Sequence, residues 1–287
     1  MKPAPFAYAR PEDLSAALDL LSGERGVAKI VAGGQSLGPM LNLRLLRPDL
    51  VIDIAGVAEL RRVSREAGKL VVGACVTHAD IEDGRVPDVT GGAMARVAAA
   101  IAYRAVRNRG TIGGSLAHAD PAADWVSALS CLGAEVELAS REGRRLLPIG
   151  GFLVGALEVA LKRGELLAAV HVPAVSPGAR WGYVKHCWKA GEFAHAIGAV
   201  LLDPAAGTGR AVIGAIEAPP LVFPDASVLF GGRIGPGFGR RFDRAAADAA
   251  LLAAGMADDV DRHVHVAVLE RAVAQAAAGD PALAEAA

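Results

Sequence analysis

The sequence predicts an α+β protein with two N-terminal lobes, followed by a unit of antiparallel strands and helices. Residues 1–56 alternate strand, helix and strand patterns, which is typical of a small α/β lobe. Residues 57–174 mix paired strands with helices in a larger lobe. In residues 175–287, three strand-like runs precede two helices. The Val-Ser-Pro-Gly stretch at the start of this region is the expected domain boundary. We therefore expect one two-lobe domain over residues 1–174 and a second domain over residues 175–287.

The small lobe is predicted from one helix and two strands. A helix is expected to begin at Pro11, because proline favours the first helical position and two acidic residues follow it. Apolar residues three and four positions apart give this helix one buried face, and Gly23 follows its end. Residues 29–32 and 50–54 are short apolar runs typical of strands.

The larger lobe is predicted as two hairpins, a further strand and several helices. Thr77 is suited to cap a short helix, and residues 87–103 read as helical at their alanine-rich end. The hairpins pair residues 60–64 with 69–73 and residues 134–139 with 144–148; a helix covers 122–132, and a strand over 166–172 ends at Pro173.

The C-terminal unit is predicted from the order of its patterns. Three strand-like runs precede two helical ones, and the glycine- and arginine-rich residues 230–242 are expected to form a loop. The strands cover residues 181–188, 193–202 and 210–218, and the helices cover 243–254 and 258–278.

The composition excludes several classes of protein. Hydrophobic residues make up 53 % of the chain and charged residues 21 %, as in globular proteins rather than disordered ones. The net charge of −1 argues against nucleic acid or an anionic membrane as a partner. No apolar run is long enough to span a bilayer, and the N-terminus lacks the apolar core of a signal peptide. We therefore expect a cytoplasmic protein.

The metal-ligating residue types show no metal spacing. Cys75, Cys131 and Cys187 are scattered, so we expect buried thiols in a reducing compartment rather than an iron–sulfur or zinc site. His263 and His265 lie two apart on an expected helix and should face different sides. The sequence assigns no metal ligand and no catalytic acid or base to this chain.

A first glycine turn follows the strand at residues 29–32. Gly33 and Gly34 lead through Gln35 and Ser36 towards Pro39, which could open a short helix. A strand, a glycine turn and a helix start together suit an anion. A tight turn without a ligand is the alternative reading.

A second glycine turn lies at residues 107–124. Gly113, Gly114 and Ser115 have little side chain, so their backbone N–H groups could approach a ligand. Asp120 and the proline after it read as the N-cap and first residue of a helix. The hydroxyls of Thr111 and Ser115 add hydrogen-bond donors.

Two such turns favour one long ligand that bridges them. A diphosphate with a nucleoside on one side and a reactive ring on the other would fit. Neither turn matches the common phosphate motifs: no G-x-G-x-x-G follows a strand, no P-loop pattern occurs, and the glycines at 235–239 have the wrong spacing. A Rossmann or P-loop interpretation is therefore disfavoured.

Three motifs together resemble a known family. They are Lys-Ile-Val-Ala-Gly-Gly-Gln-Ser-Leu at 29–37, Asn-Leu-Arg-Leu at 42–45 with Val-Ile-Asp-Ile at 51–54, and Arg-Gly-Thr-Ile-Gly-Gly-Ser-Leu-Ala-His-Ala-Asp-Pro at 109–121. This set is similar to the FAD-binding medium subunit of the molybdenum hydroxylases, the family of the carbon monoxide dehydrogenase flavoprotein subunit and the flavin domain of xanthine dehydrogenase. The resemblance covers nearly the whole chain.

The resemblance implies an electron-transfer subunit with one noncovalent FAD. It implies a small partner subunit with [2Fe–2S] clusters and a large partner subunit with molybdenum cofactor, assembled as a dimer of heterotrimers. Electrons would pass from the clusters to this flavin and on to an external acceptor. The cofactor-binding positions that it implies are Lys29, Ala32, Gly33, Gly34, Gln35, Ser36, Leu37, Thr111, Ile112, Gly113, Gly114, Ser115, Asp120, Asp124, Tyr183 and Lys185.

Each charged or aromatic residue of this set has an expected role at the cofactor and an alternative role that needs no ligand. The resemblance places Asp120 and Asp124 at the ribose, although a helix cap and a solvated helix residue are the alternatives. Strand alternation puts Tyr183 and Lys185 on one face, where they could approach the flavin ring; a lysine exposed at a strand edge is the alternative. Lys29 could equally be a surface lysine.

Three positions depart from the commonest family pattern. Gln35 stands where the carbon monoxide dehydrogenase branch has histidine, Ser115 replaces asparagine and Ala119 replaces glycine. The glutamine and serine forms resemble bacterial hydroxylases of aromatic and heterocyclic compounds. Two other functions stay open: a stand-alone FAD-dependent reductase or oxidase, and a non-enzymatic assembly protein with a degenerate site.

Overall fold

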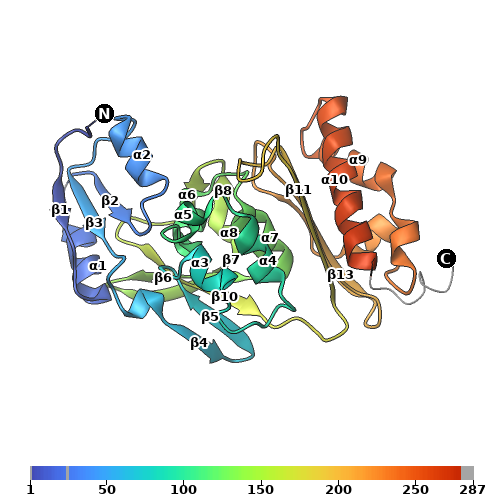
Figure 1. The fold of residues 1–287 in the computed structure, drawn as a ribbon, viewed down its shortest axis with the longest axis horizontal. Coiled ribbons are helices and arrows are strands. Elements are labelled where there is room, and N and C mark those ends of the chain that lie inside the picture. Colours follow the sequence, from blue (N-terminus) through green and yellow to red (C-terminus); the bar gives the residue numbers. More distant parts are fainter. Residues whose placement is uncertain (1, 24–25, 279–287) are drawn as a thin grey trace.

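The computed structural model describes residues 2–23 and 26–278, which form three units along the long axis of the molecule (Figure 1). The N-terminal lobe lies at one end, the C-terminal helices lie at the other, and a mixed unit lies between them. The predicted α+β class is confirmed. None of the helices in the described part of the chain is both long and apolar enough to cross a membrane.

The small lobe is a parallel three-stranded sheet in the order β1–β3–β2, with two helices. The predicted strands are present, and β1 is a third strand that the sequence did not reveal. The first helix begins later than predicted, because the Asp13 carboxylate accepts a hydrogen bond from the Ala16 N–H (2.8 Å) and so caps it. The elements are β1 (Ala7–Ala9), α1 (Leu14–Gly23), β2 (Ala28–Val31), α2 (Leu37–Asn42) and β3 (Leu50–Asp53).

The middle unit is a five-stranded antiparallel sheet in the order β4–β5–β10–β6–β7. Both predicted hairpins are present, but the first strand of the earlier one covers residues 63–66 rather than 60–64, because residues 59–61 form a 3₁₀ turn. The strands are β4 (Val63–Glu66), β5 (Lys69–Gly73), β6 (Glu135–Ser140), β7 (Gly143–Pro148) and β10 (Leu166–Pro173), with the 3₁₀ turn η1 (Glu59–Arg61) and a small separate pair, β8 (Leu153–Gly155) and β9 (Glu158–Val159).

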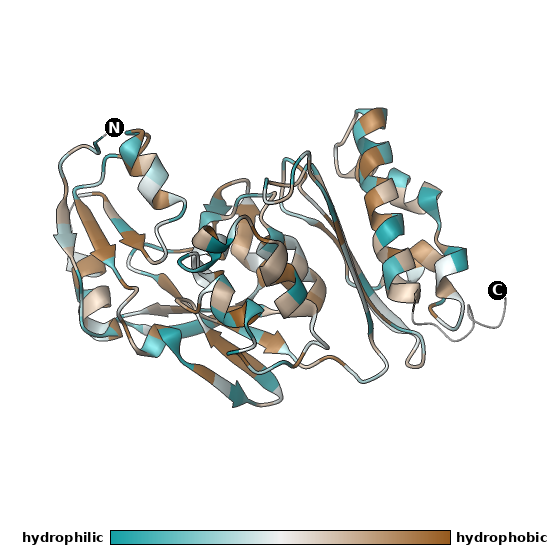
Figure 2. Cartoon of the chain, viewed as in Figure 1, coloured by the Kyte–Doolittle hydropathy of each residue, from teal (hydrophilic) through white to brown (hydrophobic). Residues whose placement is uncertain are grey.

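Six helices accompany this sheet. Figure 2 shows that these helices carry both hydrophobic and hydrophilic residues. The predicted cap of the first is confirmed, because Thr77 Oγ1 accepts from the Asp80 N–H (3.1 Å). Trp125, Phe152 and Leu116 are fully buried in the core of this unit. The helices are α3 (His78–Glu82), α4 (Ala93–Ala100), α5 (Arg104–Arg107), α6 (Ile112–His118), α7 (Asp124–Leu132) and α8 (Ile149–Phe152).

The second glycine turn differs from its prediction. Residues 113–115 lie inside α6, which Thr111 caps by accepting a hydrogen bond from the Gly114 N–H (3.0 Å). Asp120 does not cap α7; its carboxylate accepts from the Ala122 N–H (2.9 Å) in a turn, and α7 begins at Asp124. A turn was predicted here because glycine disfavours helices. In the structure, the Thr111 cap and close packing keep these glycines in a helix.

The C-terminal unit is an antiparallel sheet with helices on both faces. Helix α10 packs on one face with α9 against its outer side, and α7 of the middle unit packs on the other face (Figure 1). A Cβ atom at Gly182 would lie 1.8 Å from the Ala272 carbonyl oxygen, so this glycine lets α10 approach the sheet closely. The elements are β11 (Arg180–His186), β12 (Ala196–Asp203), β13 (Thr208–Gly214), β14 (Leu221–Phe223), α9 (Arg244–Ala253) and α10 (Asp259–Ala277).

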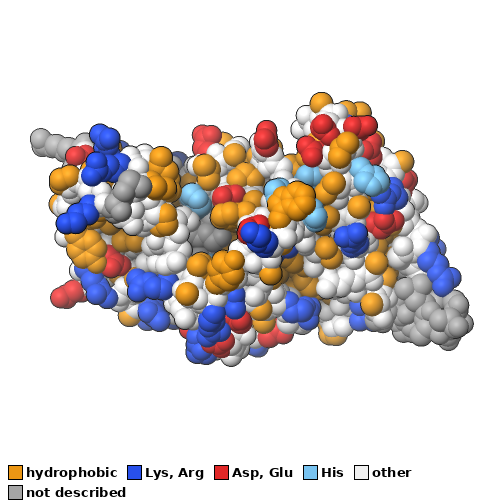
Figure 3. All heavy atoms as spheres, turned by 45° about the horizontal axis from the view of Figure 1, so that its top comes forward, with side chains coloured by type: hydrophobic (Ala, Val, Ile, Leu, Met, Phe, Trp, Pro, Cys, Tyr) orange, Lys and Arg blue, Asp and Glu red, His pale blue; other side chains and the backbone are white. Residues whose placement is uncertain are grey.

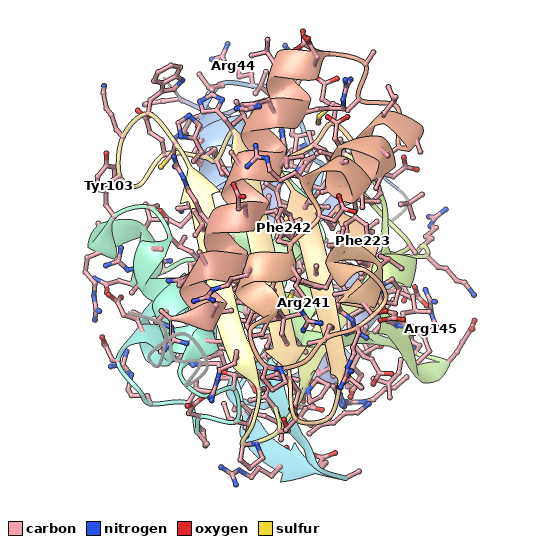
Figure 4. The ribbon with its side chains drawn as sticks, turned by 90° about the vertical axis from the view of Figure 1, so that its right-hand side faces the viewer. Arg44, Tyr103, Arg145, Phe223, Arg241 and Phe242 are labelled. Carbon is pink, nitrogen blue, oxygen red and sulfur yellow. The ribbon has the colours of Figure 1, made fainter. Side chains whose placement is uncertain are left out.

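The segment expected as a loop at residues 230–242 contributes to the core. One short 3₁₀ helix, η2 (Ala226–Phe230), ends at its first residue, and a second, η3 (Phe238–Arg241), lies within it; the buried Phe230 and Phe238 rings meet edge to face at 6.1 Å. Phe242 packs against the same core between the helices and the sheet (Figure 4). The glycine-rich pattern predicted a loop, whereas these phenylalanines pack the segment into the core of the C-terminal unit.

Candidate functional site

A cavity of about 640 Å³ lies where the small lobe, the middle unit and the tip of the β11–β12 hairpin meet. This volume is in the usual range of sites for small molecules and cofactors. Of the predicted site residues, its wall contains Lys29, Ala32, Gly33, Gly34, Gln35, Ser36, Leu37, Thr111, Gly113, Gly114, Ser115, Asp120 and Asp124. The structure thus brings both glycine turns to one cavity. Ile112 is completely buried in the core behind it.

The first glycine turn presents unused backbone donors. None of the described residues accepts a hydrogen bond from the N–H groups of residues 33–37, which run from the end of β2 into α2. Gly34 has a φ of +72°, which turns the chain as few other residues could. Such a row of N–H groups forms a backbone nest that suits a phosphate.

The second turn holds fewer free donors than its sequence suggested. The Gly113 N–H donates to the Ala74 carbonyl oxygen (3.0 Å), and the Ser115 N–H donates to the Thr111 carbonyl oxygen (3.0 Å). The Gly114 N–H is used by the Thr111 cap. The predicted backbone cradle therefore lies mainly at the first turn, and the second turn offers the Ser115 hydroxyl.

Gly33 and Gly113 are required by contacts within the protein. A Cβ atom at Gly33 would lie 2.0 Å from the Arg109 carbonyl oxygen, and one at Gly113 would lie 2.4 Å from the Ala74 Cβ. Gly33 is therefore the point at which the two turns touch. The sequence-based reason, close approach of a ligand, is replaced there by close approach of the two lobes.

Asp124 connects the cavity wall to the C-terminal sheet. Its carboxylate accepts a hydrogen bond from the Tyr183 hydroxyl (2.7 Å) and lies 3.0 Å from the Lys185 Nζ. Burial raises the pKa of Asp124, an effect that the Lys185 ammonium opposes, and burial raises the pKa of Tyr183. The predicted common face of Tyr183 and Lys185 is confirmed, but both side chains reach the cavity only through Asp124.

Several parts of the wall are absent from the predicted site residues, and two of them contribute polar or aromatic side chains. His78 lines the cavity, although its only sequence signal was its position beside the predicted Thr77 cap. The hairpin tip contributes Gly191, Glu192 and Phe193, and the Phe193 side chain stays 63 % exposed. The tip belongs to the stretch that the resemblance places beside the flavin ring, but only Tyr183 and Lys185 of that stretch were predicted as site residues.

An exposed aromatic group lies beside the hairpin tip. Trp188 is 78 % exposed and packs against His186 and His195, with ring centroids 6.1 and 5.8 Å away. Figure 3 shows hydrophobic side chains and histidines together near the middle of the face in view.

The predicted separation of the helical histidines is confirmed, because His265 is buried and His263 is exposed.

The remaining candidate groups are structural or unclustered. Cys75 and Cys131 are buried as predicted, whereas Cys187 is only half-buried. Among the described residues, no three His, Cys, Asp or Glu side chains lie close enough together to hold a metal ion.

Comparison with known proteins gives consistent matches. A family model described as the FAD binding domain in molybdopterin dehydrogenase matches residues 4–175. The carbon monoxide dehydrogenase medium chain of Hydrogenophaga pseudoflava is 34 % identical over 263 residues, or 91 % of each chain. The nicotine 6-hydroxylase medium subunit of Paenarthrobacter nicotinovorans is 35 % identical, over 82 % of this chain and 84 % of that one.

Solved structures agree over the whole chain. A chain of quinoline 2-oxidoreductase from Pseudomonas putida 86 superimposes with a TM-score of 0.84 at 32 % identity, covering 98 % of this chain and 99 % of that one. A chain of carbon monoxide dehydrogenase from Hydrogenophaga pseudoflava gives a TM-score of 0.84 at 31 % identity, covering 96 % and 98 %.

Proposed function

The chain belongs to the family of FAD-binding medium subunits of molybdenum hydroxylases, which are oxidoreductases, and from this membership we propose that it is an electron-transfer subunit. It would accept electrons from the [2Fe–2S] clusters of a small partner subunit and pass them to an external acceptor. A large partner subunit would hold the molybdenum cofactor and oxidise the organic substrate. The names of the relatives, medium chain and medium subunit, support such a division of labour.

The residues of the cavity fit FAD. A diphosphate suits the row of backbone N–H groups at residues 33–37. This row is the observation that carries the proposal, because its N–H groups have no acceptor among the described residues. Each charge-assisted bond of this kind contributes about 1.5–3 kcal/mol. When bound, FAD supplies the redox chemistry, and the protein supplies binding, orientation and electrostatics.

The other predicted site residues receive roles from their geometry. We place Asp120 at a ribose hydroxyl, because it lines the cavity and its carboxylate accepts, from the described residues, only the hydrogen bond of the Ala122 N–H. Thr111 and Ser115 line the same wall beside it, and Lys29 lies beside the first turn. Tyr183 and Lys185 act through Asp124, whose position they fix.

The organisation around this chain is part of the same proposal. We expect a dimer of heterotrimers in the cytoplasm, where three free thiols are compatible with reducing conditions. Within the chain, the FAD-binding domain covers residues 1–174, with lobes of about 1–56 and 57–174. Residues 175–287 form the C-terminal domain. The separate sheets of these regions support this division.

Native purification tests the proposal directly. We expect the chain to copurify with two other subunits, with flavin absorption bands, iron and molybdenum in the same fraction. Adding the organic substrate to this complex should bleach the flavin bands, whereas the isolated flavin-loaded chain should stay oxidised. An isolated chain that turns over an organic substrate alone would instead establish a stand-alone FAD-dependent reductase or oxidase.

A further inference from the structure

His78 is a buried histidine whose tautomer is fixed by its neighbour. Its side chain is 5 % exposed, and its Nδ1 lies 3.0 Å from the Nε1 of Trp125. An indole N–H can only donate a hydrogen bond, so the His78 Nδ1 must be the acceptor and cannot carry a proton. The ring is therefore neutral with its proton on Nε2.

The Nε2 atom lies beside the turn that opens α6. A Cβ atom at Gly110 would be 2.8 Å from it, and the His78 backbone N–H donates to the Gly110 carbonyl oxygen (2.9 Å). None of the described residues accepts a hydrogen bond from Nε2. Both His78 and Gly110 line the cavity, and the Nε2 atom is not among the fully buried side-chain atoms without a partner. The cavity is thus where its acceptor can lie.

The charge state of this ring decides what His78 can offer a ligand. Burial, with the Arg107 charge adding to it, lowers the pKa of His78 to about 4. The ring consequently donates a hydrogen bond at neutral pH without bringing a charge. Because the diphosphate is assigned to the N–H row at residues 33–37, we assign this donor to another part of the ligand: a ribityl or ribose hydroxyl or a ring carbonyl.

We propose that His78 is a cofactor-binding residue whose Nε2–H donates a hydrogen bond to an uncharged acceptor atom of FAD, with Trp125 holding it in the donor tautomer. This inference rests on the proposed FAD site and adds a residue that the glycine turns do not include. His78 touches the cofactor directly, and Trp125 acts on the cofactor only through His78.

Binding of FAD to flavin-free protein tests this role. We expect His78→Leu to raise the dissociation constant for FAD about tenfold, because the variant loses one neutral hydrogen bond to the cofactor. His78→Gln should recover most of the affinity, since its amide can donate from a similar position. His263→Leu is the matched control, because His263 is exposed on α10 away from the cavity.

A second measurement reads the hydrogen bond itself. In wild-type protein with ¹⁵N-labelled histidine, the NMR spectrum should show His78 protonated on Nε2 before and after FAD is added. Its Nε2 resonance should move when FAD binds, and the resonance of His263 should not. This measurement decides the question even if His78→Leu fails to fold.

The two levels of the argument fail separately. If wild-type protein binds no FAD, the proposed function falls, and this inference falls with it. If wild-type protein binds FAD and the His78 Nε2 resonance ignores it, the site stands and the role of His78 is wrong. Equal FAD affinity of folded His78→Leu and wild-type protein would lead to the same conclusion.

Discussion

Gly33 is the residue at which the two halves of the candidate site meet. Gly33→Ala would place a methyl group 2.0 Å from the Arg109 carbonyl oxygen, and backbone on both sides leaves little room to adjust. We expect the two turns to separate, FAD affinity to fall more than tenfold, and the free energy of unfolding to fall by about 1–3 kcal/mol. Titration of flavin-free protein with FAD, together with chemical denaturation, measures both effects.

Gly38 provides the control for this substitution. It lies in α2 a few residues away, and a Cβ atom there meets no other atom within 4 Å. Gly38→Ala should keep FAD affinity and leave the protein equally or slightly more stable, since alanine favours a helix. Equal losses in the two variants would show that the contact between the turns is not what matters.

His78 should also make stability depend on pH. The pKa of His78 is about 4 in the folded protein and about 6.5 in the unfolded chain, so only the unfolded chain gains a proton between these values. Stability is therefore unaffected above pH 6.5 and lost as the pH falls towards 4. Between pH 7 and pH 5 this one group should remove about 2 kcal/mol.

Comparison with His78→Gln isolates this contribution. Glutamine does not titrate, so flavin-free variant protein should lose about 2 kcal/mol less than wild-type protein over the same pH interval. Urea denaturation at pH 7 and pH 5 measures the difference, in which the titration of all other groups cancels. Equal losses would mean that the folded protein accepts the proton.

At the scale of elements, Asp124 joins α7 of the middle unit to β11 of the C-terminal sheet. Lys185→Met removes the ammonium 3.0 Å from this buried carboxylate and should cost about 3 kcal/mol of unfolding free energy. Tyr183→Phe, which removes one hydrogen bond, should cost about 1–2 kcal/mol. Chemical denaturation measures both losses.

Two further variants separate charge from packing in this contact. Lys189→Met makes the same change at an exposed position of the hairpin tip and should leave stability nearly unchanged. Lys185→Met combined with Asp124→Asn leaves no buried charge and should recover part of the loss. If this double variant is less stable than Lys185→Met alone, the unpaired carboxylate is not the cause.

Elements were predictable from sequence where pattern and local chemistry agreed. The hairpin at residues 60–73 and the helix of residues 93–100 follow directly from alternation and alanine content. Helix α6 was not predictable in this way, because its glycines are explained only by contacts such as Gly113 against Ala74, which lie far apart in sequence. Local propensity was overruled there by tertiary packing.

At the scale of the whole molecule, the sequence could place both glycine turns but not the complete cavity wall. The turns carry local signals: a strand followed by glycines at the first turn, and adjacent glycines with two hydroxyl residues at the second. Phe193 reaches the cavity from a hairpin of the C-terminal sheet, and His78 reaches it from the start of α3. Their positions depend on how the three units pack, which no local pattern encodes.

That packing also predicts how the molecule unfolds. Every residue of α7 is buried, because the middle unit covers one side of this helix and the C-terminal sheet covers the other. The Cys131 thiol donates to the Arg210 carbonyl oxygen across this boundary (3.7 Å). Neither domain can lose its partner without exposing this helix, so we expect a single cooperative transition despite the two domains.

Calorimetry of the flavin-free chain tests this expectation, with equal calorimetric and van't Hoff enthalpies as the expected result. A fragment of residues 1–174 should expose the side of α7 that carries Asp124 and Cys131 and should unfold at a lower denaturant concentration than the full chain, because the contacts of both residues with the C-terminal sheet are lost. Two resolved transitions, together with a stable monomeric fragment, would show that the domains fold independently.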